Sequence, residues 1–373
     1  MTLNDLRKNI DEIDLKIKDL FIERMQVAEA VAEYKSDTGD KILKPEREDE
    51  VIRQLTDGMD DEMKFAYASF IKKIMEVSRT FQYRKMLELG AEFQMDFQEQ
   101  EVEAKTVCYQ GLSGSYSEMA AGNIFPEAES RPVRSFEDVF VSINEGQADA
   151  GVLPLMNTTA GGVYEVYDLL HTYNLYINYS DIIKVDHCLA SVKGAKLDEI
   201  KEVHSHPQAL AQSAEFLKQH GITGIESMNT AIAARDVANS MDRTKAAICS
   251  AEAADRYGLE ILYESVNHNK ENATKFVAVS KQLVVEENHD RIAVVFACAH
   301  RSGSLASVLG IFGDYGVNLT EIHSRPDPKN PWEYLFYVDF TGNLKDGRIR
   351  TMFYQLYEEL PFVKIIGSYQ TKN

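Results

Sequence analysis

The first 90 residues carry apolar side chains at alternating steps of three and four, which is the repeat of one helix face. No Gly or Pro interrupts residues 1–38, so the pattern predicts one long helix that ends at Gly39. A second helix is expected from Pro45, whose fixed φ suits a first helical turn, and a third over about 61–89. The apolar stripe of the first helix consists of Leu3, Leu6, Ile10, Ile13, Ile17, Leu20, Val27 and Val31.

The rest of the chain alternates short apolar segments with helical ones, which favours α/β and α+β domains. Strands are expected at 106–109, 150–155, 182–189 and 275–280, with helical stretches such as 205–220. The segment 290–373 predicts strand, helix, two strands, helix and strand, the ferredoxin-like order. Its expected elements are 291–299, 304–315, 318–324, 333–340, 344–360 and 362–368. The acidic stretch 90–105 is expected to be a linker or a helical tail.

These patterns predict a multidomain chain. We expect an all-helical domain over 1–90, a linker over 91–104, an α/β domain over 105–282 and an α+β domain over 290–373. The formal charge of −19 on 373 residues disfavours nucleic acid or an anionic membrane as the main partner. No apolar run is long enough to span a bilayer. Four scattered cysteines without a CxxC pair favour a reducing cytoplasm over a disulfide scaffold or a structural metal.

Arg24 falls on the apolar stripe, where a buried and unpaired guanidinium is too costly. It is paired either with an Asp or Glu of the same chain or with a ligand. Lys35 shares nearly the same helix face roughly 16 Å along the axis, so the two cations suit a small dianion. Arg7 borders the stripe but lies about 25 Å from Arg24, and can join that site only from a second chain. A helix of about 55 Å also exceeds a compact 90-residue monomer, so an intertwined dimer is expected.

Ser78 and Gln82 follow an apolar face of the third helix and need polar partners, the simplest being each other. The polar positions in the three helices, in this order, resemble the all-helical chorismate mutases. They are Arg7, Arg24, Lys35, Arg47, Glu48, Ser78 and Gln82. The resemblance covers the whole segment and implies a domain-swapped three-helix dimer. It also implies the pericyclic rearrangement of chorismate to prephenate, which needs no cofactor.

In such a mutase, catalysis consists of holding the reactive conformer and stabilising charge on the breaking ether oxygen. The contacts that the resemblance implies are substrate carboxylates for Arg24, Ser78 and the partner's Arg7, the ether oxygen for Lys35 and Gln82, and the ring hydroxyl for Glu48, with Arg47 in support. One departure from the family is Lys44, which stands where an acidic residue is common.

The middle segment holds a glycine-rich turn, Gly111–Ser117, after a strand and before a helix, where backbone N–H groups can approach an anion. Four further motifs follow, and together the five resemble prephenate dehydratase over about 105–282. These motifs are PLMNTTAGGV, HSHPQALAQ, ESMNTAIAA and ENATKFVAVS. The resemblance implies two α/β lobes with the site in their cleft, as in periplasmic binding proteins. His204 and His206 suggest a His-Pro helix start rather than a metal site, since no acidic or cysteine partner shares their motif.

The implied reaction removes CO2 and hydroxide from prephenate to give phenylpyruvate, so the enzyme must assist departure of the ring hydroxyl. The resemblance makes Thr274 the hydrogen-bond donor to that hydroxyl. The implied substrate-orienting groups are Asn157, Thr158, Ser205, Gln212 and Lys275, with Glu226 as a supporting acid. Two positions depart from the family. Lys275 replaces an Arg and loses a bidentate grip, and Met156 replaces a Glu, which is expected to remove a carboxylate from the cleft.

Two alternatives stay open for the middle segment. One is a dehydratase that prefers arogenate, the transaminated form of prephenate. A carboxylate in the cleft that binds the additional ammonium group of arogenate would favour this alternative. The other is a catalytically silent module that only binds ligands, which Met156 and Lys275 keep in consideration.

The C-terminal segment resembles an ACT domain of the phenylalanine-sensing kind, over 290–370. The motifs are Gly303–Ala306, which opens a helix, and the run HSRPDPKNPWEYLFYVDF after the second strand. Here His323 and the GSLA sequence depart from the family. The resemblance implies feedback by L-phenylalanine; a purely structural dimerisation module is the alternative. The implied ligand contacts are Gly303, Ser304, Leu305, Asn318, Leu319, Ser324, Arg325 and Pro326. The whole order resembles a bifunctional chorismate mutase–prephenate dehydratase, expected as a homodimer or a tetramer.

Overall fold

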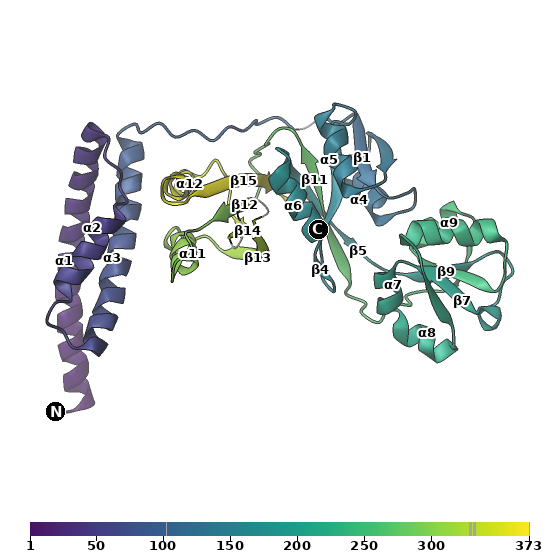
Figure 1. Cartoon of the computed structure of the whole chain (residues 1–373), viewed down its shortest axis with the longest axis horizontal. Coiled ribbons are helices and arrows are strands. Elements are labelled where there is room, and N and C mark those ends of the chain that lie inside the picture. Colours follow the sequence, from purple (N-terminus) through teal and green to yellow (C-terminus); the bar gives the residue numbers. More distant parts are fainter. Residues whose placement is uncertain (102, 328–329, 331–332, 373) are drawn as a thin grey trace. The chain divides into compact units, whose positions relative to one another are not determined.

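The computed structural model describes residues 1–373 except 102, 328–329, 331–332 and 373. The chain forms two compact units, and each unit combines segments that are distant in sequence (Figure 1). The first unit contains Met1–Asp96 and Phe296–Lys364, and the second contains Phe97–Val295 and Ile365–Asn373.

The N-terminal segment of the first unit consists of three helices, as its apolar spacing predicts. They are α1 (Leu3–Thr38), α2 (Pro45–Leu55) and α3 (Asp61–Glu88). A capping box of Thr2 and Asp5 begins α1, and Gly39, at φ 72°, ends it in the left-handed region that glycine adopts without a Cβ clash. Pro45 occupies the first turn of α2 as expected. The prediction of one long first helix is therefore confirmed.

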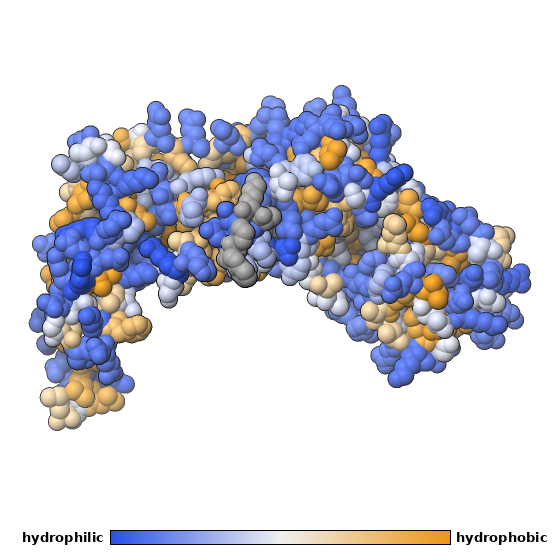
Figure 2. All heavy atoms as spheres, viewed as in Figure 1, coloured by the Kyte–Doolittle hydropathy of each residue, from blue (hydrophilic) through white to orange (hydrophobic). Residues whose placement is uncertain are grey.

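The apolar stripe of α1 is not buried within its own chain. Its eight members are between 39% and 65% exposed, and the helix buries only Met25, Ala28 and Ala32. Figure 2 shows apolar residues on the surface of the N-terminal part of α1, next to the end of the purple helix that is marked N in Figure 1. A contiguous apolar stripe of this length is unusual on the surface of a soluble monomer.

The C-terminal segment follows the predicted βαββαβ order. Its elements are β12 (Arg291–Ala297), α11 (Ser304–Asp314), β13 (Leu319–Pro326), β14 (Tyr334–Thr341), α12 (Gly347–Glu359) and β15 (Phe362–Tyr369). The strands β13 and β14 pair antiparallel. Within the first unit, α11 and α12 both pack against α3.

The second unit contains two lobes. In the first lobe the strands lie in the order β5-β11-β3-β1-β2, with β11 antiparallel to its neighbours β3 and β5. The strands are β1 (Thr106–Gln110), β2 (Glu129–Val133), β3 (Ala150–Asn157), β5 (Tyr176–Lys184) and β11 (Ala273–Ser280), with short β4 (Gly161–Gly162) beside β3 and β16 (Thr371–Lys372) beside β5. The helices are α4 (Tyr116–Ile124), α5 (Phe136–Asn144) and α6 (Tyr164–Thr172).

The second lobe has a separate five-stranded sheet in the order β10-β6-β9-β7-β8. Its strands are β6 (Cys188–Ser191), β7 (Glu202–Ser205), β8 (Thr223–Glu226), β9 (Lys245–Cys249) and β10 (Glu260–Tyr263). Its helices are α7 (Pro207–Gln212), α8 (Ala214–His220), α9 (Thr230–Ser240), α10 (Ala251–Arg256) and the 3-10 turn η1 (Leu197–Glu199). The chain passes between the lobes twice, so two α/β lobes are present as expected.

Three local expectations need correction. The predicted strand 182–189 is two strands, β5 and β6, because the chain crosses from one sheet to the other between Lys184 and Cys188. The predicted helix 205–220 is broken at Ser213, which ends α7 and begins α8. In the stretch 90–105, no helix follows Leu89 among the described residues, so the helical-tail alternative is wrong.

Candidate functional sites

The three N-terminal helices bring Arg24, Lys35 and Glu48 into one electrostatic environment. Burial lowers the pKa of Arg24, and the carboxylate of Glu48 opposes that shift. Burial and then the charge of Lys44 lower the pKa of Lys35, while Asp40 and Glu48 oppose them. Arg24 has no salt bridge within the described residues, and its Nη1 donates only a long bond of 3.5 Å to the Ile74 carbonyl. Two half-buried cations therefore lie near one shared carboxylate, that of Glu48, an arrangement suited to an anionic ligand.

Ser78 and Gln82 are buried on α3 and bond to each other, which is the simplest partnership that the sequence allowed. Gln82 Nε2 donates to the Ser78 hydroxyl at 3.4 Å and to its carbonyl at 3.3 Å. Gln82 Oε1 is buried without a hydrogen-bond partner in the described structure.

The remaining predicted mutase residues lie at the surface of the single chain. Arg7 is exposed near the start of α1, and the unbroken helix between it and Arg24 makes their separation along the axis about 25 Å. Arg47 is exposed and pairs with Glu50 at 2.7 Å. Lys44 pairs with Asp40 at 2.8 Å. Within one chain, Arg7 and Arg47 do not join the group formed by Arg24, Lys35 and Glu48, whereas Lys44 acts on it through its charge.

Arg79 was missed by the sequence reasoning, although it follows Ser78 directly. Its side chain is 8% exposed, and its guanidinium forms ion pairs with Glu48 and, at 2.8 Å, with Glu359 of α12. Burial alone would lower the pKa of Arg79, but the two carboxylates outweigh burial and raise it. Burial raises the pKa of Glu359, and Arg79 only partly offsets this shift. A search for apolar spacing passes over such a residue, because its partner lies 280 positions away.

The second unit has a cleft of about 220 Å³ whose walls come from both lobes. Thr274, Asn157 and Gln212 line it, together with the glycine-rich turn before α4. The complete lining is Gln110, Gly111, Ser115, Tyr116, Ser117, Pro154, Asn157, Val185, His187, His206, Gln208, Ala209, Gln212, Asn229, Thr230, Asn272, Thr274 and Phe276.

A buried hydrogen-bond network connects the polar side chains of this cleft. Asn157 Nδ2 donates to Thr274 Oγ1 and to Asn272 Oδ1, both at 2.9 Å. Asn272 Nδ2 in turn donates to Gln212 Oε1 at 3.1 Å. The orientation of the Asn157 amide follows from its own loop, since its Oδ1 accepts the backbone N–H groups of Thr159 and Ala160. Because Thr274 Oγ1 accepts from Asn157, its own proton can be directed into the cleft.

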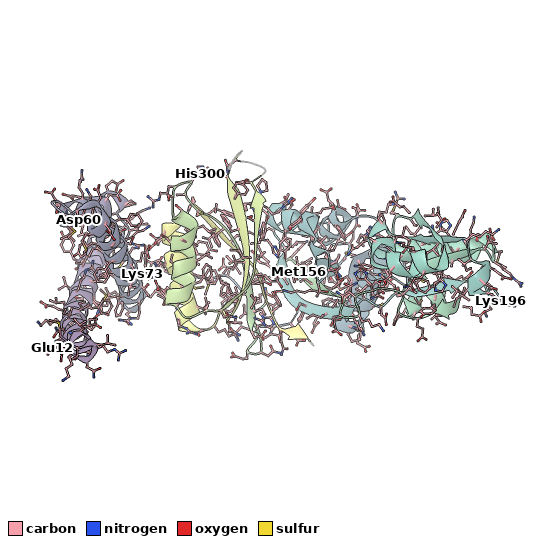
Figure 3. The ribbon with its side chains drawn as sticks, turned by 90° about the horizontal axis from the view of Figure 1, so that it is seen from below. Glu12, Asp60, Lys73, Met156, Lys196 and His300 are labelled. Atoms are coloured by element: carbon pink, nitrogen blue, oxygen red, sulfur yellow. The ribbon has the colours of Figure 1, made fainter. Side chains whose placement is uncertain are left out.

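Lys275 and Met156 lie away from this cleft, which corrects an expectation. Lys275 of β11 pairs with Met156 of β3, and the neighbouring pair is Thr274 with Asn157. Because successive strand residues point to opposite faces, Lys275 and Met156 point away from the face of Thr274 and Asn157. Lys275 Nζ donates to the Tyr369 hydroxyl at 2.8 Å. The Met156 departure therefore removes no carboxylate from the cleft lining (Figure 3 labels this residue).

Three other predicted dehydratase residues do not line the cleft. Ser205 is fully buried, and its hydroxyl donates to the Ile248 carbonyl at 2.6 Å. Thr158 is exposed; its hydroxyl bridges to the other strand, donating to the Glu271 carbonyl and accepting from the Ala273 N–H. Glu226 is exposed at the end of β8, and its charge opposes the burial that lowers the pKa of His206. His206 itself begins α7, with Nδ1 accepting the Gln208 N–H, as the His-Pro motif predicts.

The cleft lining contains no Lys, Arg, Asp or Glu among the described residues. Instead, α4 and α9 begin there, through Tyr116 and Ser117 in one case and Asn229 and Thr230 in the other. The first N–H groups of a helix have no partner within the helix and carry partial positive charge. The cleft can therefore bind carboxylates without a cationic side chain.

In the C-terminal segment, Ser304 and Leu305 at the start of α11 line a second cavity with Tyr334 and Phe336 of β14. Ser304 Oγ is buried without a partner in the described structure. Ser324 pairs with Phe336, and Pro326 with Tyr334, so both lie on the strand face that the two aromatic residues share.

The other expected ACT contacts lie elsewhere in the described structure. Arg325 occupies the opposite face of β13 from Ser324, while Gly303, Asn318 and Leu319 are outside the cavity lining. Gly303 caps α11 at φ 79°. Within the motif run, Pro328, Lys329, Pro331 and Trp332 lie outside the described residues.

Neither a metal cluster nor a membrane helix is found in the part of the chain that the structure describes. No group of three or more His, Cys, Asp or Glu side chains is placed to hold a metal ion there. None of the described helices combines the length and the apolar character needed to cross a bilayer.

Comparisons with known proteins agree with the arrangement of these sites along the chain. A family model for prephenate dehydratase matches residues 107–283, between models for chorismate mutase type II over 6–83 and the ACT domain over 292–351. Arogenate dehydratase/prephenate dehydratase 1 of Arabidopsis thaliana is 34% identical over 279 residues, covering 70% of this chain and 71% of the relative. The chain belongs to the prephenate dehydratase family.

Within the prephenate dehydratase family, one bacterial relative shares the full arrangement. The bifunctional chorismate mutase/prephenate dehydratase of Buchnera aphidicola is 29% identical over 381 residues, covering 99% of this chain and 97% of the relative. The predictions of a mutase domain, a dehydratase domain and an ACT domain in one enzyme are confirmed.

Two solved structures each resemble about seven tenths of the chain. A prephenate dehydratase from Arthrobacter aurescens in complex with L-Phe matches with a TM-score of 0.66 and 27% identity, over 71% of this chain and 89% of that one. A quorum-quenching acylase, GqqA, matches with a TM-score of 0.66 and 26% identity, over 72% and 98%.

Proposed function

We propose that this chain converts chorismate to prephenate at α1–α3 and prephenate to phenylpyruvate in the cleft of the second unit, with feedback by L-phenylalanine. The observation that carries the proposal is the dehydratase cleft, where a Thr hydroxyl and two helix N-termini converge without any charged side chain. The domains are proposed to span 1–90, 105–282 and 290–373, with 91–104 as the linker. The free cysteines fit a cytoplasmic location.

For the mutase, the two half-buried cations near Glu48 support the assignment. Arg24 and Lys35 would bind a carboxylate and the ether oxygen, and Glu48 the ring hydroxyl. The reaction breaks a C–O bond as a C–C bond forms, so positioning and charge stabilisation suffice. Gln82 Oε1 is buried and unpaired, but an amide oxygen only accepts. Donation to the ether oxygen therefore requires the Gln82 amide to turn its Nε2 from Ser78 toward the ligand.

For the dehydratase, Thr274 is the hydrogen-bond donor to the leaving hydroxyl. The bond from the ring to its carboxylate breaks and its electron pair enters the ring, while the C–O bond breaks. The departing hydroxide, hydrogen-bonded to Thr274, takes up a proton from solvent and leaves as water. Asn157 holds the Thr274 oxygen, and Gln212 and Asn272 hold Asn157 in turn. The N-termini of α4 and α9 suit the substrate carboxylates.

The same cleft favours prephenate over arogenate. Arogenate carries an ammonium group that an enzyme would bind with a carboxylate, and the described cleft lining has none. Arogenate remains the second candidate, because the Arabidopsis relatives are named for both substrates. The silent-sensor alternative loses its support, since Met156 and Lys275 lie outside the cleft.

A homodimer is part of the proposal. The exposed stripe of α1 offers an apolar surface over a helix of about 54 Å, and an identical helix of a second copy would cover it. The same association would bring the partner's Arg7 to Arg24, which the helix geometry forbids within one chain. Two dimers could associate further into a tetramer.

Regulation by L-phenylalanine is assigned to the cavity at the start of α11. The helix N-terminus and the unpaired Ser304 hydroxyl suit the carboxylate of an amino acid, while Leu305 and Phe336 suit an aromatic ring. The L-Phe complex of the Arthrobacter relative supports this ligand. Two of the other contacts expected from the family, Ser324 and Pro326, are the cross-strand partners of Phe336 and Tyr334, which line this cavity.

One assay tests both proposed reactions. Purified protein is given chorismate, and prephenate and phenylpyruvate are followed with time. Prephenate that appears and is consumed as phenylpyruvate forms is the expected result. Prephenate that accumulates without phenylpyruvate would leave the mutase and exclude the dehydratase. Parallel reactions with prephenate and arogenate as the starting substrate distinguish the two dehydratase candidates.

A further inference from the structure

Arg79 connects the mutase helices to the ACT helix α12 through two carboxylates. Its Nη1 pairs with Glu48 Oε1, and its Nε pairs with Glu359 Oε1 at 2.8 Å. The Arg79 and Glu359 side chains are only 8% and 7% exposed. Glu48 Oε2 has no hydrogen bond within the described residues, so one oxygen of this carboxylate is held while the other is available.

The network continues from Glu359 into the C-terminal segment. Gln355 Nε2 donates to Glu359 Oε1 at 3.0 Å, and the Tyr315 hydroxyl donates to Gln355 Oε1 at 3.1 Å. Tyr315 follows the last residue of α11. A buried series of polar contacts therefore extends from Glu48 to the C-terminal end of α11.

Two contacts fix α11 on α3 beside this network. The Ser307 hydroxyl donates to Glu76 Oε1 at 3.1 Å, and Lys73 Nζ pairs with Asp314 at 2.8 Å. Figure 3 labels Lys73 on the side of α3 that faces α11. One cavity is lined by all three members of this ion-pair group, Glu48, Arg79 and Glu359, and by Ser304 at the start of α11. The ACT helices thus form part of the surroundings of Glu48.

We propose that Glu359 of the ACT segment is a positioning residue of the chorismate mutase, which acts through Arg79 to hold Glu48 with one oxygen free for substrate. This inference rests on the proposed mutase role of Glu48. Glu359 accepts from Nε of the guanidinium and Glu48 from Nη1, so the two carboxylates hold the plane of Arg79 from different nitrogens. A guanidinium that is released from Glu359 can turn its planar fork toward Glu48 and take both carboxylate oxygens.

Loss of Glu359 should affect substrate binding more than the chemical step. A contact to the ring hydroxyl, which is distant from the breaking bond, holds ground state and transition state alike, and its loss raises KM with little change in kcat. We therefore expect the isosteric variant Glu359→Gln to raise the KM for chorismate roughly fivefold, with kcat within a factor of about two.

Asp314→Asn provides the matched control. It also changes an acid of the ACT segment that pairs with a basic residue of α3, but Lys73 does not contact Glu48. This control should keep the wild-type KM for chorismate. Phenylpyruvate formation from added prephenate should be unchanged in both variants, which shows that they are folded. The thermal unfolding midpoint should fall in Glu359→Gln, which breaks a buried ion pair, and stay near the wild-type value in Asp314→Asn.

A double-mutant cycle completes the test. In an Arg79→Met background, Glu359→Gln should have no further effect on KM, because the connecting guanidinium is absent. Equal KM values for Glu359→Gln, Asp314→Asn and wild type would overturn the inference while leaving the mutase proposal intact. A wild-type enzyme that forms no prephenate from chorismate would instead contradict the proposed function itself.

Discussion

The amide of Asn157 determines how the Thr274 hydroxyl can act. Backbone N–H groups of Thr159 and Ala160 occupy the amide oxygen, so the amide nitrogen is the group that meets Thr274 Oγ1. The Thr274 oxygen is therefore an acceptor inside the protein, and its proton remains for the substrate. A neutral hydroxyl suits this role because it donates a hydrogen bond without having to ionise.

Removing this hydroxyl should affect only the dehydratase. Thr274→Ala is expected to lower kcat for phenylpyruvate formation roughly a hundredfold or more, since the loss of one preorganised hydrogen-bond donor to developing negative charge costs about that much. Thr274→Ser keeps the oxygen and should retain most of the activity. Both variants should form prephenate from chorismate at the wild-type rate. Unchanged phenylpyruvate formation by Thr274→Ala would exclude the assignment.

His187 gives the second residue-scale prediction. Burial lowers its pKa to about 4, against an opposing hydrogen bond with Gln212. As the pH falls from 6.5 toward 4, the unfolded chain takes up a proton at this position and the native protein does not. Stability should be lost in that window, by about 3 kcal/mol at its lower end.

The comparison of thermal unfolding midpoints at pH 7 and pH 4.5 measures this effect. His187→Gln, which cannot take up the proton, should lose less stability between the two pH values than wild type. Equal losses in the two proteins would show that other groups account for the acid sensitivity.

At the scale of elements, α1 is the helix that a single chain cannot complete. Its apolar stripe is exposed and its two arginines are too far apart for one ligand. Both features have the same cause, which is that the helix continues without a break from Leu3 to Thr38. A second copy of α1 accounts for both.

Mixed dimers test this arrangement. Arg7→Ala and Arg24→Ala chains should each lack mutase activity as pure dimers. After the two are unfolded and refolded together in equal amounts, half of the dimers are mixed, and each mixed dimer has one site with both arginines. About one quarter of the wild-type activity is expected. No recovery, with dimers present by ultracentrifugation, would contradict a shared site.

At the scale of the whole molecule, regulation requires that the cavity at α11 binds an effector. L-Phenylalanine should bind the full-length enzyme in isothermal titration and lower its rate of phenylpyruvate formation. Leu305→Asn should weaken this binding about tenfold, as the loss of one buried apolar contact predicts. Absence of binding at millimolar L-phenylalanine would leave the ACT segment with a structural role only.

The long helices and the family motifs were determined by the local sequence. An apolar repeat without Gly or Pro is sufficient to predict α1, because helix formation depends on neighbours three and four positions apart. Thr274, Asn157 and Gln212 were found through the resemblance of their motifs to prephenate dehydratase. Asn272 belongs to one of these motifs and was passed over beside Thr274.

Only the tertiary structure decided which faces those residues occupy. Lys275 is adjacent to Thr274 in sequence, yet strand alternation points it to Tyr369 and away from the cleft. The split of 182–189 between two sheets is equally invisible to an apolar pattern. The importance of Arg79 is apparent only from its ion pair with Glu359. A contact across 280 positions depends on how helices pack rather than on any local spacing.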